Sequence, residues 1–373
     1  MEISSYVNDA VELLRWLIAT PRTSRNEQGA ADIMQRTIES YGFKVCREAN
    51  NVWAIDPHYD ATLPTVLLNA HLDTVRPVST WTRNPYEPCL EGDTLYGLGS
   101  NDCGGGLVSL LQVFRIITKE FKEFKEFKVQ SSKLNVQCSK YNLVYLASAE
   151  EEVTGSEGIV RALPLLPKID VAIVGEPTGM QPAIAEKGLM VIDGIARGQS
   201  GHAARNEGVN AIYEALDDLV WLRDYHFEKV SPLLGPTKMT VTVLNAGTQH
   251  NVVPDECRFT IDVRTNEHYR NEDVFQFLQQ HVRSELRARS FRLHSSSIPV
   301  EHPLVQRCLQ MGMTPFGSPT LSDQSVMPFP SMKLGPGESA RSHSANEFIR
   351  VSEIAYAIST YVQLLDGLFS DKK

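Results

Sequence analysis

The sequence predicts an α/β protein of two domains, in which a smaller α+β domain interrupts a larger domain built on a mostly parallel sheet. The chain has 373 residues, more than one hydrophobic core usually supports. From Leu67 to Gly175 short apolar runs alternate with helical stretches, which is typical of a parallel sheet covered by helices. The order then changes to β-α-β-β-α-β, that of a ferredoxin-like unit, before the first pattern returns. We therefore expect one domain made of residues 1–180 and 300–373, and an inserted domain at 181–299.

Three strands of the larger domain end in side chains that can bind metal. They are expected at TVLLNAH (65–71), YNLVYLASAE (141–150) and DVAIVGE (170–176). Open parallel sheets bind ligands beyond the carboxyl ends of their strands, so these three ends predict a shared site. Amphipathic helices are expected at 11–18, after residue 106 and at 351–369.

The inserted domain is expected to contain four strands and two helices. Alternating apolar and polar residues in ECRFTIDVRTN are typical of a half-buried strand. The expected strands lie at 188–198, 238–247, 256–266 and near 291–296, and the helices at 209–225 and from residue 272.

The charge and the N-terminal residues exclude several classes of partner. Thirty-six basic and forty-five acidic side chains give a net charge of −9, which disfavours binding to nucleic acid or anionic lipid. Charged residues interrupt the apolar run Val11–Ile18, and Asp9 precedes it where a signal peptide needs positive charge. No apolar run reaches the roughly 18 residues that a membrane span needs. We expect a cytoplasmic protein with no nucleic-acid or membrane partner.

The cysteines do not form a disulfide framework or a cysteine-ligated zinc site. They are far apart in the sequence, so we expect reduced thiols that pack as small apolar groups. The six are Cys46, Cys89, Cys103, Cys138, Cys257 and Cys308.

His71 and Asp73 form a His-Leu-Asp step at the end of the first strand. The carboxylate of Asp73 could hydrogen-bond the imidazole and determine which ring nitrogen faces a metal. Taken alone, His71 reads as a structural histidine and Asp73 as a turn residue. Their position at a strand end in a ligand-binding fold favours the metal-site interpretation.

Asp102 lies in GLGSNDCGGG, where the glycines allow close backbone approach before an apolar helix begins. It could bridge two metals or cap that helix. Glu150, Glu151 and Glu152 follow a strongly apolar strand, and adjacent side chains there point in different directions. A buried strand end is an unfavourable place for uncompensated negative charge, which a dication would neutralise.

Glu176 and His343 complete the candidate ligand set. Glu176 precedes a proline at the exit of a strand, and His343 lies in the loop GPGESARSHSANE before the last helix. Each residue alone carries little information, and His343 alone reads as a surface histidine. Together with the strand-end residues they supply the imidazole and carboxylate groups that a hydrolytic zinc site prefers.

Seven motifs follow one another along nearly the whole chain: HLDTV (71–75), LYGLGSNDCGGG (95–106), ASAEEEVTGSEG (147–158), VGEPTG (174–179), GQSGHAARNEGVNAI (198–212), NVVPDECRFTIDVRTN (251–266) and SHSANE (342–347). This set resembles the M20 metallopeptidase and deacylase family, most closely its acetylornithine deacetylase and succinyl-diaminopimelate desuccinylase branch. Glu150 stands where that family usually has aspartate, and Cys103 replaces the start of its common Met-Lys pair. Neither departure removes a ligand.

The resemblance implies a zinc-peptidase-like catalytic domain with an inserted dimerisation (lid) domain. It implies two Zn²⁺ ions per subunit, for which Co²⁺ or Mn²⁺ could substitute. Asp102 would be shared between them. His71 and Glu176 would complete one zinc site, and Glu152 and His343 the other.

The resemblance also implies how an amide bond is cleaved. Glu151 would act as general base on the water that attacks the amide carbonyl, and Asp73 would support His71. His202 resembles a histidine that reaches the active site of the partner subunit and stabilises the tetrahedral oxyanion, which implies a homodimer.

The expected substrate is a small N-acyl amino acid, with N2-acetylornithine, an intermediate of arginine biosynthesis, as the first to test. Arg264 resembles an arginine that binds a substrate carboxylate, although a structural ion pair is the alternative. Asn251, Lys187 and the loop from Thr320 to Asp323 are weaker candidates for the same pocket. The alternative functions are removal of a succinyl group from N-succinyl-ornithine or N-succinyl-diaminopimelate, di- or tripeptidase activity, and non-catalytic metal binding.

Overall fold

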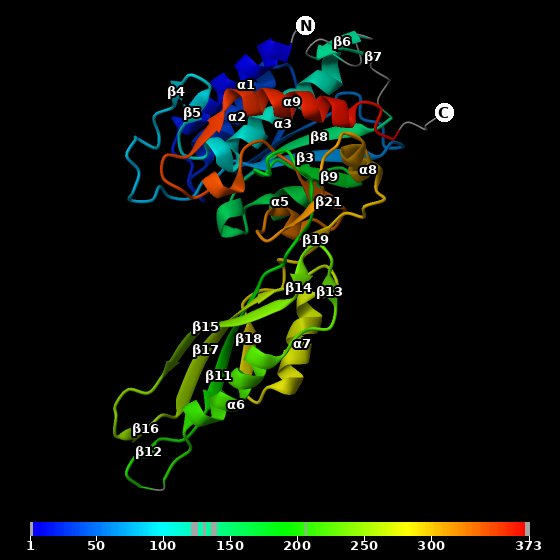
Figure 1. Ribbon diagram of the computed structural model, residues 1–373. Helices are drawn as coiled ribbons and strands as arrows, with labels where there is room; N and C mark the ends of the chain where they lie inside the picture. Colours follow the sequence, from blue (N-terminus) through cyan, green and yellow to red (C-terminus); the bar gives the residue numbers. More distant parts are fainter. Residues whose placement is uncertain (1–2, 121–125, 130–131, 136–139, 206, 370–373) are drawn as a thin grey trace. The chain divides into compact units, whose positions relative to one another are not determined.

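The computed structural model describes residues 3–120, 126–129, 132–135, 140–205 and 207–369. Cys138, which we expected to be a reduced thiol, lies outside these residues. The chain divides into two compact units. Unit 1 comprises residues 1–184, 298–316 and 322–373, and unit 2 comprises residues 185–297 and 317–321. The larger unit is therefore built from separate stretches of the chain (Figure 1).

Unit 1 contains most of the helices and the large sheet. Its helices are α1 (Ile3–Ile18), α2 (Gln28–Ser40), α3 (Gly105–Arg115), α5 (Ile159–Ala162), α8 (Pro303–Gln310) and α9 (Val351–Leu365). Its strands are β1 (Val45–Glu48), β2 (Asn51–Ile55), β3 (Thr65–His71), β4 (Cys89–Glu91), β5 (Thr94–Tyr96), β6 (Glu126–Val129), β7 (Ser132–Asn135), β8 (Asn142–Ser148), β9 (Val171–Val174), β21 (Ser331–Lys333) and β22 (Phe348–Arg350). Strands β10 (Ala183–Glu186) and β20 (Phe316–Ser318) cross the boundary between the units.

The centre of the large sheet is parallel, as the sequence predicts. Neighbouring strands follow the order β1-β2-β8-β3-β9-β21-β10. Strand β3 is parallel to both β8 and β9, and β21 is parallel to β9. Every residue of β3 and β8 is buried, as expected for strands covered on both faces. The parallel arrangement brings the carboxyl ends of β3, β8 and β9 to one edge.

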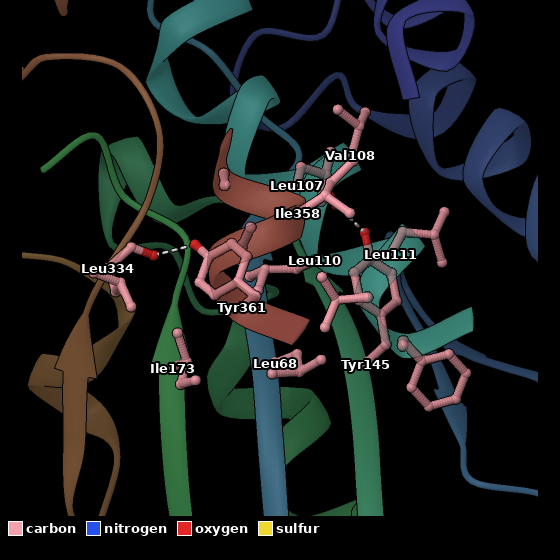
Figure 2. Packing of buried hydrophobic residues seen from close by; sticks show 14 of the residues in the cluster. Leu68, Leu107, Val108, Leu110, Leu111, Tyr145, Ile173, Leu334, Ile358 and Tyr361 are labelled. Carbon is pink, nitrogen blue, oxygen red and sulfur yellow. Dashed lines mark hydrogen bonds between the residues drawn. The ribbon is translucent and has the colours of Figure 1, made fainter. Parts of the chain in front are cut away.

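Alternate side chains of the central strands enter two different hydrophobic clusters. Leu68 and Tyr145 belong to the larger cluster, which includes residues of α1, α2, α3 and α9. Leu67 and Val144 point to the opposite face, where they pack with residues of α5. Figure 2 shows the larger cluster, in which the buried hydroxyl of Tyr145 donates a hydrogen bond to a backbone carbonyl of α3. The polar atom is satisfied, so the aromatic ring can fill the core.

Unit 2 has the ferredoxin-like order that the sequence predicts. Its strands are β11 (Met190–Arg197), β12 (Gly201–His202), β13 (Val230–Ser231), β14 (Gly235–Pro236), β15 (Lys238–Ala246), β16 (Val252–Val253), β17 (Glu256–Arg264), β18 (Glu285–Ala288) and β19 (Ser296–Ser297), and its helices are α6 (Ala211–Asp224) and α7 (Asn271–His281). The main sheet is antiparallel in the order β15-β17-β11-β18. Residues of α6 and α7 pack on one face of this sheet. The fold class predicted from the sequence is confirmed for both units.

One expected strand was placed wrongly. The sequence predicted the fourth strand of the inserted domain near 291–296, whereas the sheet uses β18 at 285–288. Glu285 and Arg287 are charged and exposed, and only two residues of β18 face the sheet's covered side. Its alternation of apolar and polar residues is therefore too short to be recognised in the sequence. Phe291 packs against the same hydrophobic cluster without belonging to a strand. Among the described residues, none of the helices is long and apolar enough to cross a membrane.

Candidate metal centre

His71 is the last residue of β3, and its side chain is buried. Its Nδ1 lies 2.9 Å from the backbone oxygen of Asp73 and 3.6 Å from the carboxylate Oδ1 of the same residue. Its Nε2 lies 3.2 Å from Oδ1 of Asp102 and 3.7 Å from Oε1 of Glu176. One ring nitrogen therefore faces Asp73, and the other faces two carboxylates that could share a metal with it.

Asp102 lies between β5 and α3, in a segment whose backbone is closely packed. The Asp102–Cys103 peptide bond is cis. Gly106 in the first turn of α3 is required sterically, because a Cβ there would lie 1.8 Å from the backbone oxygen of Gly175. This contact brings the start of α3 against the end of β9. The N-terminal cap of α3 is Gly104, with no capping hydrogen bond from a side chain, so the alternative reading of Asp102 as a helix cap is wrong.

The three glutamates after β8 separate as their backbone turns. Glu150 has a positive φ of 53°, and its carboxylate accepts a hydrogen bond from the backbone N–H of Glu157. Glu152 instead directs its carboxylate to His343, with Nε2 lying 3.0 Å from Oε2. Glu151 is close enough to His71 for electrostatic interaction. The expectation that only some of the three face the site therefore agrees with their geometry.

Glu176 and His343 come from distant parts of the sequence. Glu176 follows β9 by two residues, and its buried Oε1 has no hydrogen-bond partner among the described residues. His343 has a positive φ of 57°, which is uncommon for a residue other than glycine. Its side chain is 55% exposed, and its Nε2 lies 3.7 Å from Oδ2 of Asp102.

The two oxygens of Asp102 face two different groups of side chains. Oδ1 is directed to His71, which also neighbours Glu176. Oδ2 is directed to His343, which also binds Glu152. A carboxylate in this position can bridge two cations, one on each side. All five sequence-predicted ligands therefore meet at one end of the large sheet, within unit 1.

The charges of this cluster indicate that it is built for cations. Burial and the neighbouring Asp102 raise the pKa of Glu176 to about 8. Burial also raises the pKa of Glu151 well above its ordinary value, with further contributions from neighbouring carboxylates. The hydrogen bond to Glu152 raises the pKa of His343 to about 9. Carboxylates crowded in this way repel one another, and divalent cations would relieve that repulsion.

The donor atoms also fit a metal. Ligand atoms of His71, Asp102 and Glu152 all lie within 4.8 Å of one another, as do those of His71, Cys103 and Glu176. The unpartnered Oε1 of Glu176 is a buried acceptor that lacks a donor. Imidazole nitrogen and carboxylate oxygen are ligands that hydrolytic zinc sites use. The residues present thus fit a pair of divalent ions.

Two further predicted residues, His202 and Asn251, are neighbours in unit 2. His202 ends β12 and pairs with Val252 of β16. The backbone N–H of Ala203 donates to the backbone oxygen of Asn251 at 3.0 Å. Both side chains are exposed. The two residues are therefore available on one loop region of unit 2.

Arg264 and Lys187 are also in unit 2. Arg264 makes a two-point ion pair with Asp262, at 2.8 Å and 3.1 Å, so the ion pair named as the alternative is present, and the binding of a substrate carboxylate stays a prediction. The Nζ of Lys187 donates to the backbone oxygen of Pro236 at 3.2 Å. Burial lowers the pKa of Lys187, and the positive charges of Lys238 and Arg264 lower it further. Three cationic side chains thus lie close together in unit 2.

Several residues around the metal centre received no role from the sequence. Arg22 and Glu347 are buried and form hydrogen bonds with the loop that carries Asp102. Asp323, in the loop that the sequence offered only as a weaker candidate for the substrate pocket, is buried and accepts a hydrogen bond from Ser148 at the end of β8. No local pattern marks these residues, because their partners are distant in the sequence. The only signal was that Glu347 belongs to the motif SHSANE.

Comparisons with known proteins show which families and relatives this chain resembles. A family model described as a peptidase dimerisation domain matches residues 184–290, and a model of peptidase family M28 matches residues 51–201. Acetylornithine deacetylase of Klebsiella pneumoniae is 28% identical over 381 residues, covering 91% of this chain and 92% of the relative. Succinyl-diaminopimelate desuccinylase of a Caulobacter species is 26% identical over 293 residues, covering 74% of this chain and 70% of the relative.

Solved structures share the fold at lower sequence identity. Aminopeptidase PepT of Bacillus cereus superposes with a TM-score of 0.74 at 16% identity, covering 99% of this chain and 100% of that one. A dinuclear metal-binding peptidase of the M20 family from Bacillus subtilis gives a TM-score of 0.71 at 15% identity, covering 97% and 98% of the two chains. These similarities extend over both units.

Proposed function

The chain belongs to the M20 family and is a metal-dependent amidohydrolase, and from this premise we propose that it removes the acyl group of an N-acyl amino acid, with N2-acetylornithine as the preferred substrate. The observation that carries the proposal is the position of Asp102. Its two carboxylate oxygens face His71 on one side and His343 on the other, the arrangement that a pair of bridged metal ions requires.

We propose Zn²⁺ as the metal, with two ions per subunit. His71, Asp102 and Glu176 would hold one ion, and Asp102, Glu152 and His343 the other. Mixed imidazole and carboxylate ligands support this choice, and Co²⁺ or Mn²⁺ would occupy the same positions. Bound there, the ions supply Lewis acidity and make water acidic enough to ionise near neutral pH.

Glu151 is the proposed general base. Its backbone N–H binds Asp73 at 3.0 Å, which holds it at the end of β8 beside the ligands. Burial raises the pKa of Glu151, and a carboxyl group with a raised pKa is suited to exchange protons near neutral pH. Glu151 would take a proton from the attacking water and return it to the amine that leaves.

The cationic residues of unit 2 support an anionic substrate. Arg264 is the proposed partner of the α-carboxylate, because a guanidinium can bind both carboxylate oxygens. Lys187 and Lys238 add positive charge nearby. N2-acetylornithine has a single carboxylate, whereas a succinyl amino acid has a second one in its acyl group. The additional lysines make removal of a succinyl group the second candidate function.

A homodimer is part of the proposal. The match to a peptidase dimerisation domain supports it, and so does an exposed apolar surface on unit 2. This surface combines the edge strand β15 with α6, and its exposed residues are Ile212, Tyr213, Leu216, Val220, Val243 and Leu244. Exposed apolar stripes and open strand edges are usually covered by another chain. In such a dimer His202 would act in the active site of the partner.

The substrate is tested by a panel of N-acetyl-ornithine, N-succinyl amino acids and unmodified di- and tripeptides, assayed on Zn²⁺-loaded protein by release of free amine. Hydrolysis of N2-acetylornithine with the highest kcat/KM is the expected result, and it would place the enzyme in cytoplasmic arginine biosynthesis. A preference for succinyl substrates or for peptides would replace this assignment. No turnover on any member would favour non-catalytic metal binding.

The variant Glu151→Gln tests the mechanism itself. It keeps the size of the side chain but removes the base, so we expect kcat to fall by about 10²- to 10⁴-fold. Metal content, measured by atomic absorption, should stay at the wild-type value because Glu151 is not a ligand. Full activity of the metal-loaded variant would show that another group transfers the proton.

A further inference from the structure

Glu347 connects the loop that carries Asp102 with the loop that carries His343. It is 2% exposed and lies four residues after His343. Its Oε1 accepts hydrogen bonds from the backbone N–H groups of Asn101 and Asp102, both at 2.8 Å. Its Oε2 accepts a third from the N–H of Gly99 at 2.9 Å. One side chain therefore determines the path of the backbone from Gly99 to Asp102.

The side chain of Asn101, in the loop that carries Asp102, in turn binds the backbone of the loop that carries His343. Its side-chain oxygen accepts from the backbone N–H of Glu338 at 3.0 Å, and its amide group donates to the backbone oxygen of Glu338 at 3.1 Å. The backbone N–H of Gly97 also donates to the backbone oxygen of Glu347 at 3.0 Å. Hydrogen bonds thus connect the loop that carries Asp102 with the loop that carries His343, although these loops are far apart in the sequence.

Arg22 binds the backbone of the loop that carries Asp102 and also the backbone between His71 and Asp73. Its guanidinium donates to the backbone oxygen of Gly99 at 2.8 Å and also to that of Leu72, between His71 and Asp73. Glu347 binds the N–H of Gly99 and Arg22 binds the C=O of the same residue, so both polar groups of Gly99 are held. Arg22 is fully buried and lies close enough to Glu347 to interact with its charge. A buried carboxylate is costly unless several donors and a cation offset its desolvation, as here.

The contacts of Glu347 are directed at the ligand loop and not at the helix that follows it. Helix α9 begins at Val351 and is capped by Glu353 and Arg350. His343 is held at a positive φ, a conformation that persists only when surrounding contacts enforce it. The separation of 3.7 Å between His343 and Asp102 is therefore set by the bonds that join their loops.

We propose that Glu347 is a positioning residue of the metal centre, which, together with Arg22, holds Asp102 where its two oxygens can serve two cations. This inference rests on the proposed metal-dependent function. Glu347 touches neither the metal nor the substrate; it acts through the backbone of residues 99–102. Outer residues that orient metal ligands typically contribute about 10- to 100-fold to metal affinity.

Two substitutions of Glu347 separate its geometry from its charge. Glu347→Gln keeps the length but turns an amide NH₂ toward a backbone N–H, and Glu347→Asp keeps the charge but shortens the side chain by one methylene. Metal affinity is measured by competition with a chelator, and the visible absorption spectrum of Co²⁺-loaded protein reports the ligand geometry. Thermal unfolding of the metal-free protein reports folding. Glu353→Gln is the matched control, because Glu353 is a carboxylate of the same segment that binds Arg341 instead.

Positioning predicts that both Glu347 variants bind metal about 10- to 100-fold more weakly and change the Co²⁺ spectrum, while Glu353→Gln matches wild type in both. Loss in the Gln variant alone would overturn the proposal in favour of a simple charge effect. Wild-type affinity and spectrum in both variants would also overturn it. If neither variant folds, Asn101→Ala decides, with about fivefold weaker binding expected and unchanged binding contradicting the proposal. If the proposed metal-dependent function is wrong, the wild-type protein itself will bind no pair of metal ions. That result distinguishes failure of the function from failure of the positioning role of Glu347.

Discussion

The carboxylate of Asp73 accepts a hydrogen bond from the backbone N–H of Glu151 at 3.0 Å. The same carboxylate accepts from the N–H of Glu152 at 3.1 Å and from the hydroxyl of Ser24 at 2.7 Å. Asp73 therefore does more than orient His71. It also fixes the turn that carries the proposed base and one ligand.

Asp73→Asn should lower both catalytic activity and metal affinity. An amide in place of the carboxylate directs its NH₂ at one of the two backbone N–H groups, so the turn after β8 would shift. We expect kcat/KM and metal affinity each to fall by about 10- to 100-fold, measured on protein with verified metal content. Ser24→Ala removes only one of the donors and should cost less than about tenfold. Equal effects of the two substitutions would contradict this account.

Arg264→Met should weaken substrate binding more than folding. If Arg264 binds the substrate carboxylate, loss of its charge-assisted hydrogen bonds should lower kcat/KM by about 10- to 100-fold. The effect should appear mainly in KM, because the carboxylate is remote from the bond that breaks.

Arg289→Met is the matched control for that measurement. Arg289 also makes a two-point ion pair with an aspartate of the same sheet, Asp193, at 2.8 Å and 2.9 Å. A purely structural role of Arg264 predicts similar stability losses and unchanged kcat/KM for both variants. Such a result would remove Arg264 from the substrate site.

Leu216→Glu should dissociate the proposed dimer. Leu216 is 46% exposed on α6, and a buried charge in a dimer interface is costly. Light scattering coupled to gel filtration should show a monomer, with activity strongly reduced because His202 no longer reaches a partner. Leu165→Glu, which changes an apolar residue of unit 1 that is 54% exposed, should leave the mass and the activity unchanged. A fully active monomer would exclude His202 from catalysis.

Glu353→Gln should destabilise the protein at neutral pH but not at acid pH. Burial alone raises the pKa of Glu353, but hydrogen bonds from Arg341 and the backbone of Arg350 outweigh it, so the pKa is lowered. A carboxyl group whose pKa is lower in the folded state stabilises the fold above its unfolded pKa of about 4.3. That contribution disappears as the pH falls through the folded pKa.

The difference is measured by urea unfolding of metal-free wild type and variant at pH 7 and near pH 3. We expect about 1 kcal/mol at pH 7, as for a partly exposed ion pair, and almost none at the acid end. A difference that stays constant with pH would mean that the amide disturbs packing instead of removing an ion pair.

The sequence revealed the parts of the fold that depend on local pattern. Strand β3 contains a run of apolar residues and is buried throughout, and β11 of unit 2 alternates between buried and partly exposed residues, so both strands could be predicted from their side chains. Strand β18 was missed because Glu285 and Arg287 interrupt its apolar character. Phe291 drew the prediction toward its own position, although its contribution is packing and not pairing.

The candidate ligands were visible because they end strands or lie in glycine-rich loops. The residues that hold these ligands in position were not visible in the sequence. Glu347 binds the N–H of Asp102 across 245 positions of the chain, and Arg22 binds Gly99 across 77 positions. When a side chain binds a backbone N–H or C=O group, the residue that supplies that backbone group can have any side chain, so its identity does not reveal the hydrogen bond. Such residues emerge only from three-dimensional contacts. The roles of His202, Asn251, Lys187 and Arg264 stay predictions.

The insertion of unit 2 has a consequence for biosynthesis of the protein. Residues 185–297 separate four of the proposed ligands from His343, and α9, which packs against α1 and α3, follows the insertion in the sequence. On the ribosome we therefore expect the nascent chain to carry an incomplete centre, rich in carboxylates, until the C-terminal segment emerges. The last segment to emerge both completes the core and supplies His343, so we expect the full set of proposed ligands to assemble only after the C-terminal segment has been made.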